Sequence, residues 1–162
     1  MARALIVGCG CRGRELGARL AALDWQVRGT SREDRGLKEI RAAGFEPAKA
    51  DPDRPGTVLE FCGDVAVVVW LLGSAAGESE AIAAIHGPRL ERLLEKLVDS
   101  PVRGFAYEAV GRALESDLRA GREIVEHAAG TWRIPIVLLE EERDANRWAE
   151  STAAAISGLL AD

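Results

Sequence analysis

The chain alternates short runs of β-branched residues with longer stretches whose apolar residues recur every three or four positions. The short runs are typical of strands and the longer spacing is typical of amphipathic helices. We expect six strands, at residues 4–7, 26–30, 45–48, 65–71, 102–107 and 134–139. We expect helices at residues 12–23, 34–43, 88–98, 116–129 and 144–160, and a helical turn at 57–62.

The alternation of strands and helices predicts a parallel sheet built from βαβ units. Residues 65–71 are apolar on both faces, as in a strand at the centre of such a sheet. Glycines follow the first strand, which favours a doubly wound α/β fold of the Rossmann type with strand order 3-2-1-4-5-6. We see no internal repeat or linker, so residues 1–162 are interpreted as one domain.

Composition narrows the range of partners. Hydrophobic residues make up 48% of the chain and charged residues 29%, which is ordinary for a globular protein in water. The net charge of -5 disfavours a nucleic-acid partner, because phosphate binding needs a basic face. No apolar run approaches the roughly 18 residues of a membrane span, and none resembles a signal peptide, so we expect a cytoplasmic protein without a membrane partner.

The three cysteines, Cys9, Cys11 and Cys62, predict neither disulfides nor a metal site. Their number is odd, and nothing in the sequence indicates export to an oxidising compartment. Cys9 and Cys11 flank a glycine without a histidine nearby, which is a poor zinc-ligand set, whereas small residues suit a crowded turn.

A glycine-rich motif follows the first expected strand and opens the first expected helix. In that context the G-x-G-x-x-G spacing is typical of dinucleotide binding. Its first glycine permits a tight turn, its second lets the backbone approach a diphosphate, and its third lets helix and strand pack closely. The amides at the helix N-terminus then bind the anion. The predicted diphosphate loop comprises Gly8, Cys9, Gly10, Cys11, Arg12 and Gly13. The alternative is a glycine-rich turn without a ligand.

The end of the second expected strand indicates which dinucleotide is bound. Domains that bind NAD(H) usually carry an acidic residue there, which binds the ribose hydroxyls. This chain has Thr30, Ser31 and Arg32, two hydroxyls and a guanidinium that suit a 2′-phosphate. Arg12 could add a second positive charge. We therefore expect NADP(H) rather than NAD(H), although a shift of one or two residues would put Glu33 at the position that favours NAD(H).

These segments together resemble the atypical and extended short-chain dehydrogenases/reductases, the NAD(P)-dependent epimerase-like group. Residues 5–13 look like the first-strand motif of that family, residues 27–32 like the second strand of its NADP-binding members, and residues 64–69 like its central strand. The resemblance implies that Asp51 lies near the adenine. It also implies that a loop of small residues contacts the cofactor, here Leu72, Gly73 and Ser74.

The chain departs from that family where the chemistry is done. The family uses a Tyr-x-x-x-Lys pair, in which the lysine lowers the pKa of the tyrosine. The only tyrosine is Tyr107, and Gly111 stands where the lysine would be. The chain also ends where family members add their substrate-binding part. His86, before a helix start, is a candidate proton carrier facing the crevice, with a polar cap on a loop as the alternative. Tyr107 is the other candidate, and its expected role is packing.

Apolar stripes on the helices at 88–98 and 116–129 allow a homodimer. In the resembled family such helices pair across a dimer axis. The stripes could equally cover their own sheet.

Three functions remain open. The first is an NADP(H)-binding protein without the dehydrogenase triad, acting as a sensor, regulator or subunit. The second is an oxidoreductase or epimerase-like enzyme that uses His86 or residues of a partner. The third is an interaction scaffold that binds no dinucleotide.

Overall fold

The computed structural model describes residues 1–161 and contains a six-stranded sheet in which all neighbouring strands are parallel. The order is β3-β2-β1-β4-β5-β6, so the predicted Rossmann fold and its strand order are confirmed. The strands are β1 (Arg3–Val7), β2 (Gln26–Ser31), β3 (Glu46–Lys49), β4 (Val67–Trp70), β5 (Gly104–Glu108) and β6 (Ile136–Leu139).

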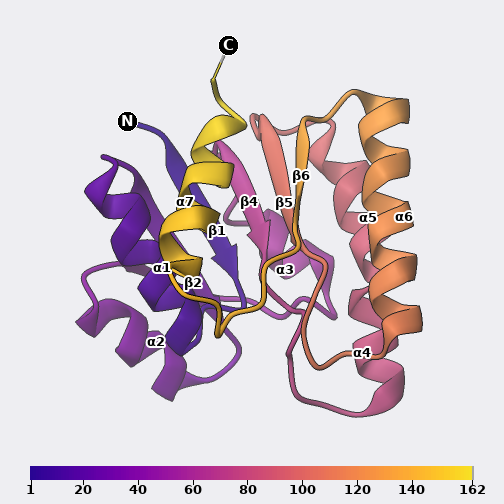
Figure 1. The fold of residues 1–162 in the computed structure, drawn as a ribbon, viewed down its shortest axis with the longest axis horizontal. Coiled ribbons are helices and arrows are strands. Elements are labelled where there is room, and N and C mark those ends of the chain that lie inside the picture. Colours follow the sequence, from indigo (N-terminus) through magenta and orange to yellow (C-terminus); the bar gives the residue numbers. More distant parts are fainter. Residues whose placement is uncertain (162) are drawn as a thin grey trace.

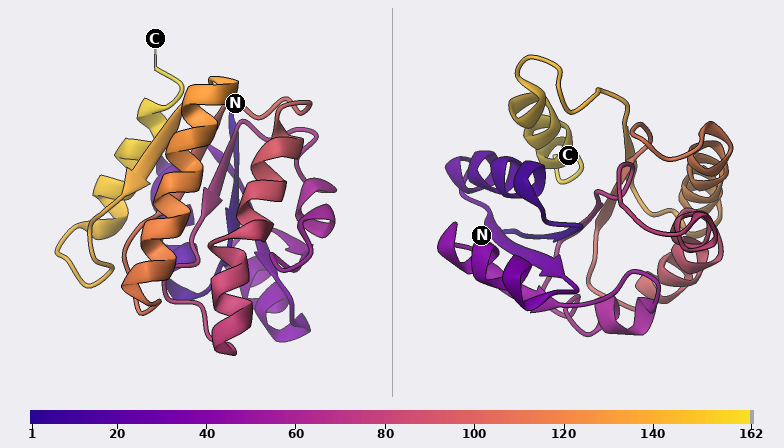
Figure 2. Two further views of the ribbon diagram at one scale, coloured as in Figure 1. Left: turned by 90° about the vertical axis from the view of Figure 1, so that its right-hand side faces the viewer. Right: turned by 90° about the horizontal axis from the view of Figure 1, so that it is seen from below.

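Helices cover both faces of the sheet. They are α1 (Cys11–Ala22), α2 (Asp34–Ala42), α3 (Pro55–Leu59), α4 (Ser79–Ile85), α5 (Pro88–Leu97), α6 (Glu115–Trp132) and α7 (Trp148–Gly158). Helices α1 and α7 pack together on one face, and α5 and α6 pack together on the other (Figure 1). The strands point downwards in Figure 1, so the right-hand view of Figure 2 looks onto their carboxyl ends.

The core has two layers because alternate residues of each strand point to opposite faces. Val67 and Val69 of β4 belong to the cluster under α1 and α7, whereas Val68 and Trp70 belong to the cluster under α5 and α6. All four residues are fully buried. This confirms that the apolar run forms a central strand covered on both faces.

The apolar stripe of α5 covers its own sheet. Leu90, Leu93, Leu94 and Leu97 are at most 2% exposed and belong to the core. This confirms the alternative to a dimer interface for α5, while a homodimer stays a prediction. None of the helices in residues 1–161 is long and apolar enough to cross a membrane.

Two helices differ from the prediction by more than three residues. Helix α4 was not expected, because its seven residues are too few for a clear periodicity next to Pro88. The last helix begins at Trp148 rather than at residue 144, because Arg147 has a left-handed backbone with φ of 65°. Residues 140–147 therefore form a loop beyond β6.

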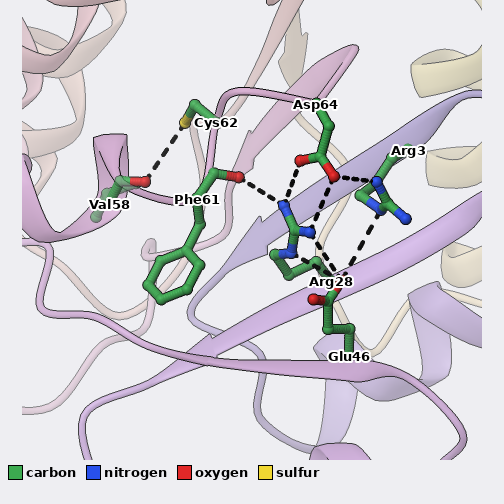
Figure 3. A network of polar contacts seen from close by, with 7 residues as sticks. All are labelled: Arg3, Arg28, Glu46, Val58, Phe61, Cys62 and Asp64. Atoms are coloured by element: carbon green, nitrogen blue, oxygen red, sulfur yellow. Dashed lines mark hydrogen bonds and ion pairs between the residues drawn. The ribbon is translucent and has the colours of Figure 1, made fainter.

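A buried arginine of β2, Arg28, joins this strand to its neighbours through a network of polar contacts (Figure 3). Arg28 is 7% exposed, and its Nε lies 2.9 Å from Oε2 of Glu46 while its Nη1 lies 2.6 Å from Oδ1 of Asp64. Nη1 also donates to the carbonyl oxygen of Phe61 at 2.8 Å. The hydrogen bond from Arg28 is the main cause that lowers the pKa of Asp64. The cluster ties β3 and the turn before β4 to the middle of β2.

Candidate functional site

A cavity of about 340 Å³ lies at the carboxyl edge of the sheet, where β1, β2 and β4 end. This is where the strand order reverses and where doubly wound folds bind ligands. Nine of the predicted cofactor-binding residues line it: Gly8, Cys9, Gly10, Thr30, Ser31, Arg32, Asp51, Leu72 and Ser74.

The glycine loop is held against the end of β2. The backbone N–H of Gly8 donates to Oγ1 of Thr30 at 3.3 Å, and that of Cys9 donates to the Thr30 carbonyl oxygen at 3.2 Å. Gly8 has φ of +87°, which side chains disfavour, so the tight turn requires glycine there. Gly13 lies close to the loop, and a Cβ at this position would stand 3.3 Å from Sγ of Cys9.

The N-terminal end of α1, called its mouth below, is not blocked by a side chain cap. Gly10 is the N-cap residue, no side chain caps this end, and no atom lies within 4 Å of the place where a Gly10 Cβ would be. The amides of the first helical turn have no intrahelical acceptor, and the helix dipole is positive there. The geometry therefore offers donors and unfilled space to an anion.

Three residues of the predicted loop do not line the cavity: Cys11, Arg12 and Gly13. Arg12 instead pairs with Glu15 at 2.8 Å on the outer side of the helix. Arg14 lines the cavity and pairs with Glu39, which also lines it, at 3.1 Å. The sequence interpretation missed Arg14, because the motif spacing does not show which side of the helix faces the crevice.

Cys9 is a packing residue within this loop. It is 3% exposed, and burial raises the pKa of its thiol to about 12, so it stays protonated near neutral pH. A Cβ at Gly29 would stand 2.6 Å from its sulfur, so Cys9 fills the space between the loop and β2.

The end of β2 carries hydroxyls and a cation towards the cavity. Thr30 is buried, Ser31 is the last strand residue, and Arg32 follows it on the surface. No carboxylate in residues 1–161 pairs with Arg32. Glu33 is the N-cap of α2 and does not line the cavity.

Aspartates lie on the same side of the cavity, after β3. Asp51 accepts a hydrogen bond from the backbone N–H of Asp53 at 2.9 Å, and Asp53 pairs with Arg89 at 3.1 Å. Both aspartates line the cavity, as does Gly36 in the first turn of α2.

The loop after β4 forms the opposite side of the cavity. Leu72 and Ser74 line it, but Gly73 does not. The Gly73 N–H donates to Oε1 of Glu108 at 2.7 Å, and Oγ of Ser74 accepts from the N–H of Arg112 at 3.0 Å.

Arg143, in the loop after β6, lines this side of the cavity and was missed by the sequence interpretation. Its Nε lies 2.7 Å from Oε2 of Glu108, and its Nη2 lies 2.8 Å from Oε1. Nη2 also donates to the carbonyl oxygen of Leu71 at 3.1 Å. Nothing local in the sequence identifies this pair, because its members stand 35 positions apart.

His86 and Tyr107 lie behind the cavity wall. Both are fully buried and neither lines the cavity, so the interpretation of His86 as a residue facing the crevice is wrong. His86 is the C-cap residue of α4, as the alternative had it, but it is buried in the core and not on the surface. Nε2 of His86 lies 3.0 Å from the Leu72 carbonyl oxygen, which can only accept, so this nitrogen carries the proton. Nδ1 then accepts from the Tyr107 hydroxyl at 2.6 Å. The pair supports the back of the loop, and the expected packing role of Tyr107 is confirmed.

No protein-family model and no curated protein matches the chain. Solved structures do. UDP-glucuronic acid 4-epimerase from Bacillus cereus, in complex with NAD, is 16% identical and superposes with a TM-score of 0.67 over 84% of this chain and 54% of its own. The chain is structurally similar to the Rossmann domains of short-chain dehydrogenases/reductases and NAD(P)-dependent epimerases.

Two further structures support that likeness. A short-chain dehydrogenase/reductase superfamily protein from Agrobacterium tumefaciens, with bound NAD, is 15% identical, with a TM-score of 0.69 over 99% of this chain and 63% of its own. Triphenylmethane reductase from Citrobacter sp., complexed with NADP(H), is 16% identical, with a TM-score of 0.64 over 85% of this chain and 49% of its own. The chain thus spans between about half and just under two-thirds of the length of these proteins. At such identities the likeness shows a shared fold.

Proposed function

We propose that this protein binds NADP(H) in the cavity at the carboxyl edge of the sheet and acts as a sensor, regulator or subunit without dehydrogenase catalysis of the usual kind. The open mouth of α1 at Gly10 carries this proposal. Unfilled space and the positive end of a helix dipole coincide there with first-turn amides that have no intrahelical acceptor, beside a cavity lined by the ends of three strands. The similar structures from Bacillus cereus and Citrobacter sp. were solved with NAD and with NADP(H).

The preference for a 2′-phosphate rests on the end of β2. Ser31 and Arg32 line the cavity there, whereas Glu33 does not. An arginine without a carboxylate partner in residues 1–161 is suited to a phosphate dianion, to which it can donate two parallel hydrogen bonds.

A role other than dehydrogenation is supported by the groups that are missing. Tyr107 has no lysine four positions later and is hydrogen bonded to His86 inside the core. Burial raises the pKa of its phenol further above its usual value, which is the reverse of what a proton-shuttling tyrosine needs. An enzyme built on this chain would need reacting groups from elsewhere.

Ligand-dependent stability tests the proposal. The free energy of unfolding is measured in three samples, with NADP⁺, with NAD⁺ and without ligand. A ligand at a hundred times its dissociation constant should add about 2.7 kcal/mol to it. We expect NADP⁺ to stabilise at lower concentration than NAD⁺, and Arg32→Asp to reverse the order. Arg41→Asp is the matched control, because Arg41 is an exposed arginine of α2 that does not line the cavity. Absence of stabilisation by either dinucleotide would leave the interaction scaffold as the function.

A further inference from the structure

Arg143 has one guanidinium nitrogen that donates no hydrogen bond within residues 1–161. Its Nε and Nη2 hold both carboxylate oxygens of Glu108, and Nη2 also holds the Leu71 carbonyl oxygen. Nη1 has no acceptor among residues 1–161, and the side chain is 26% exposed where it lines the cavity. A guanidinium has five N–H donors in one plane, so fixing two nitrogens also fixes the direction of the third.

Glu108 fixes this plane from inside the core. Its side chain is 1% exposed, and it also accepts the N–H of Gly73 at 2.7 Å. A buried carboxylate that holds three donors leaves the arginine little freedom, so a ligand would not have to order it.

The local net charge around Arg143 differs from that around Arg32. Glu108 offsets the positive charge of Arg143, whereas no carboxylate in the described residues pairs with Arg32. A neutralised guanidinium with two spare N–H donors suits an uncharged carbonyl oxygen better than a phosphate.

The two arginines lie on opposite sides of the point where the strand order reverses. Arg32 follows β2, while Arg143 binds Leu71 and Glu108 at the ends of β4 and β5. A doubly wound sheet consists of two mononucleotide-binding halves, and a dinucleotide spans the crevice between them. Since the end of β2 contacts the adenine ribose, the other half of the ligand falls on the side of Arg143.

We propose, resting on the NADP(H)-binding function above, that Nη1 of Arg143 donates to a carbonyl oxygen in the non-adenine half of the dinucleotide. In NADP(H) that group is the nicotinamide carboxamide. Arg143 thereby distinguishes the complete dinucleotide from nucleotides that share only its adenine half.

Calorimetric titrations with NADP⁺ and with 2′,5′-ADP, which lacks the nicotinamide half, test this assignment. The wild-type protein is expected to bind NADP⁺ more tightly than 2′,5′-ADP. Arg143→Lys keeps a cation for Glu108 but loses the planar fork, so we expect its affinity for NADP⁺ to fall about tenfold and its affinity for 2′,5′-ADP to stay unchanged, given the worth of a hydrogen bond from a charged donor. Glu108→Gln, which releases Arg143 but keeps an acceptor for Gly73, is expected to give the same selective loss.

Arg147→Lys is the matched control. Arg147 belongs to the same loop, is 73% exposed and pairs with Glu150 away from the cavity, so neither affinity should change. Equal wild-type affinities for the two ligands, or equal losses of both in Arg143→Lys, would overturn the assignment of Arg143 while leaving the NADP(H) site in place. Failure of the wild type to bind either ligand would instead refute the proposed function and this inference with it.

Discussion

The Tyr107 hydroxyl donates a hydrogen bond to Nδ1 of His86 at 2.6 Å, and the other ring nitrogen of His86 donates to the Leu72 carbonyl oxygen at 3.0 Å. A residue that titrates near neutral pH is thus locked in one neutral tautomer behind the cavity wall. The pair has consequences for stability that an exposed histidine would not have.

The stability of the protein should decrease as the pH is lowered, because of His86. Burial lowers the pKa of this histidine below its usual 6.5, so below that pH the unfolded chain takes up a proton that the folded one refuses. The contribution is complete above about pH 6.5 and is lost as the pH falls towards the folded-state pKa. Urea unfolding at a series of pH values should show this slope in the wild type and not in His86→Gln. It should persist in His127→Gln, because His127 is exposed.

Gly121 of α6 makes room for the Tyr107 hydroxyl. A Cβ at Gly121 would overlap the phenol oxygen and its ring carbon, so Gly121→Ala should destabilise the protein by about 1–3 kcal/mol through overpacking. Gly130→Ala in the same helix has nothing within 4 Å and should stabilise by about 0.5 kcal/mol through helix propensity. Chemical denaturation measures both changes, and a Gly121→Ala protein as stable as Gly130→Ala would contradict this packing.

Asp64 should support stability at neutral pH and lose that role in acid. Its pKa is lowered by the hydrogen bond from Arg28, so its contribution is present above the ordinary aspartate pKa of about 3.9 and is lost as the pH falls through the folded-state value. Asp64→Asn is expected to cost about 1 kcal/mol at pH 7, since the carboxylate is half exposed and Arg28 keeps Glu46. Acid titration of unfolding should be flatter in this variant below about pH 4, and an unchanged profile would show that the ion pair is not stabilising.

Gly10→Ala should separate binding from folding. Gly10 has φ of -85°, which alanine adopts, and its Cβ would meet no protein atom within 4 Å, so stability should not fall. The added methyl group would occupy the space through which a diphosphate approaches α1. We expect the affinity for NADP⁺ to weaken at least about tenfold, equivalent to about 1.4 kcal/mol, when measured by titration. Undiminished affinity would mean that the nucleotide does not use this helix mouth.

Local patterns in the sequence were sufficient for the frame of the site. The alternation of elements predicts the parallel sheet, and the glycines after the first strand favour its order. The motif from Gly8 to Gly13 correctly predicts a tight turn and an open helix mouth. The end of β2 at Ser31 also lies where the pattern of apolar residues puts it, within one residue. The turn, the N-terminus of α1 and the end of β2 each depend on neighbours within a few positions.

The parts that the sequence did not predict depend on distant partners. Arg143 has its role because Glu108 lies 35 positions earlier in β5, and His86 is satisfied by Tyr107, 21 positions later. A polar residue after a short helix has the same local pattern whether it is exposed or buried with partners. The pairing of β6 beside β5 and the packing of α4 against the sheet bring these groups together.

The backbone of the loop after β4 is held by three side chains from separate parts of the chain: Arg143 binds Leu71, His86 binds Leu72 and Glu108 binds Gly73. One cavity wall is therefore completed only by Arg143, from the final quarter of the polypeptide. Occupancy of the cavity and ordering of residues 140–147 should accordingly be linked in both directions, so that a bound nucleotide slows amide hydrogen exchange in a segment that supplies only Arg143 to the lining.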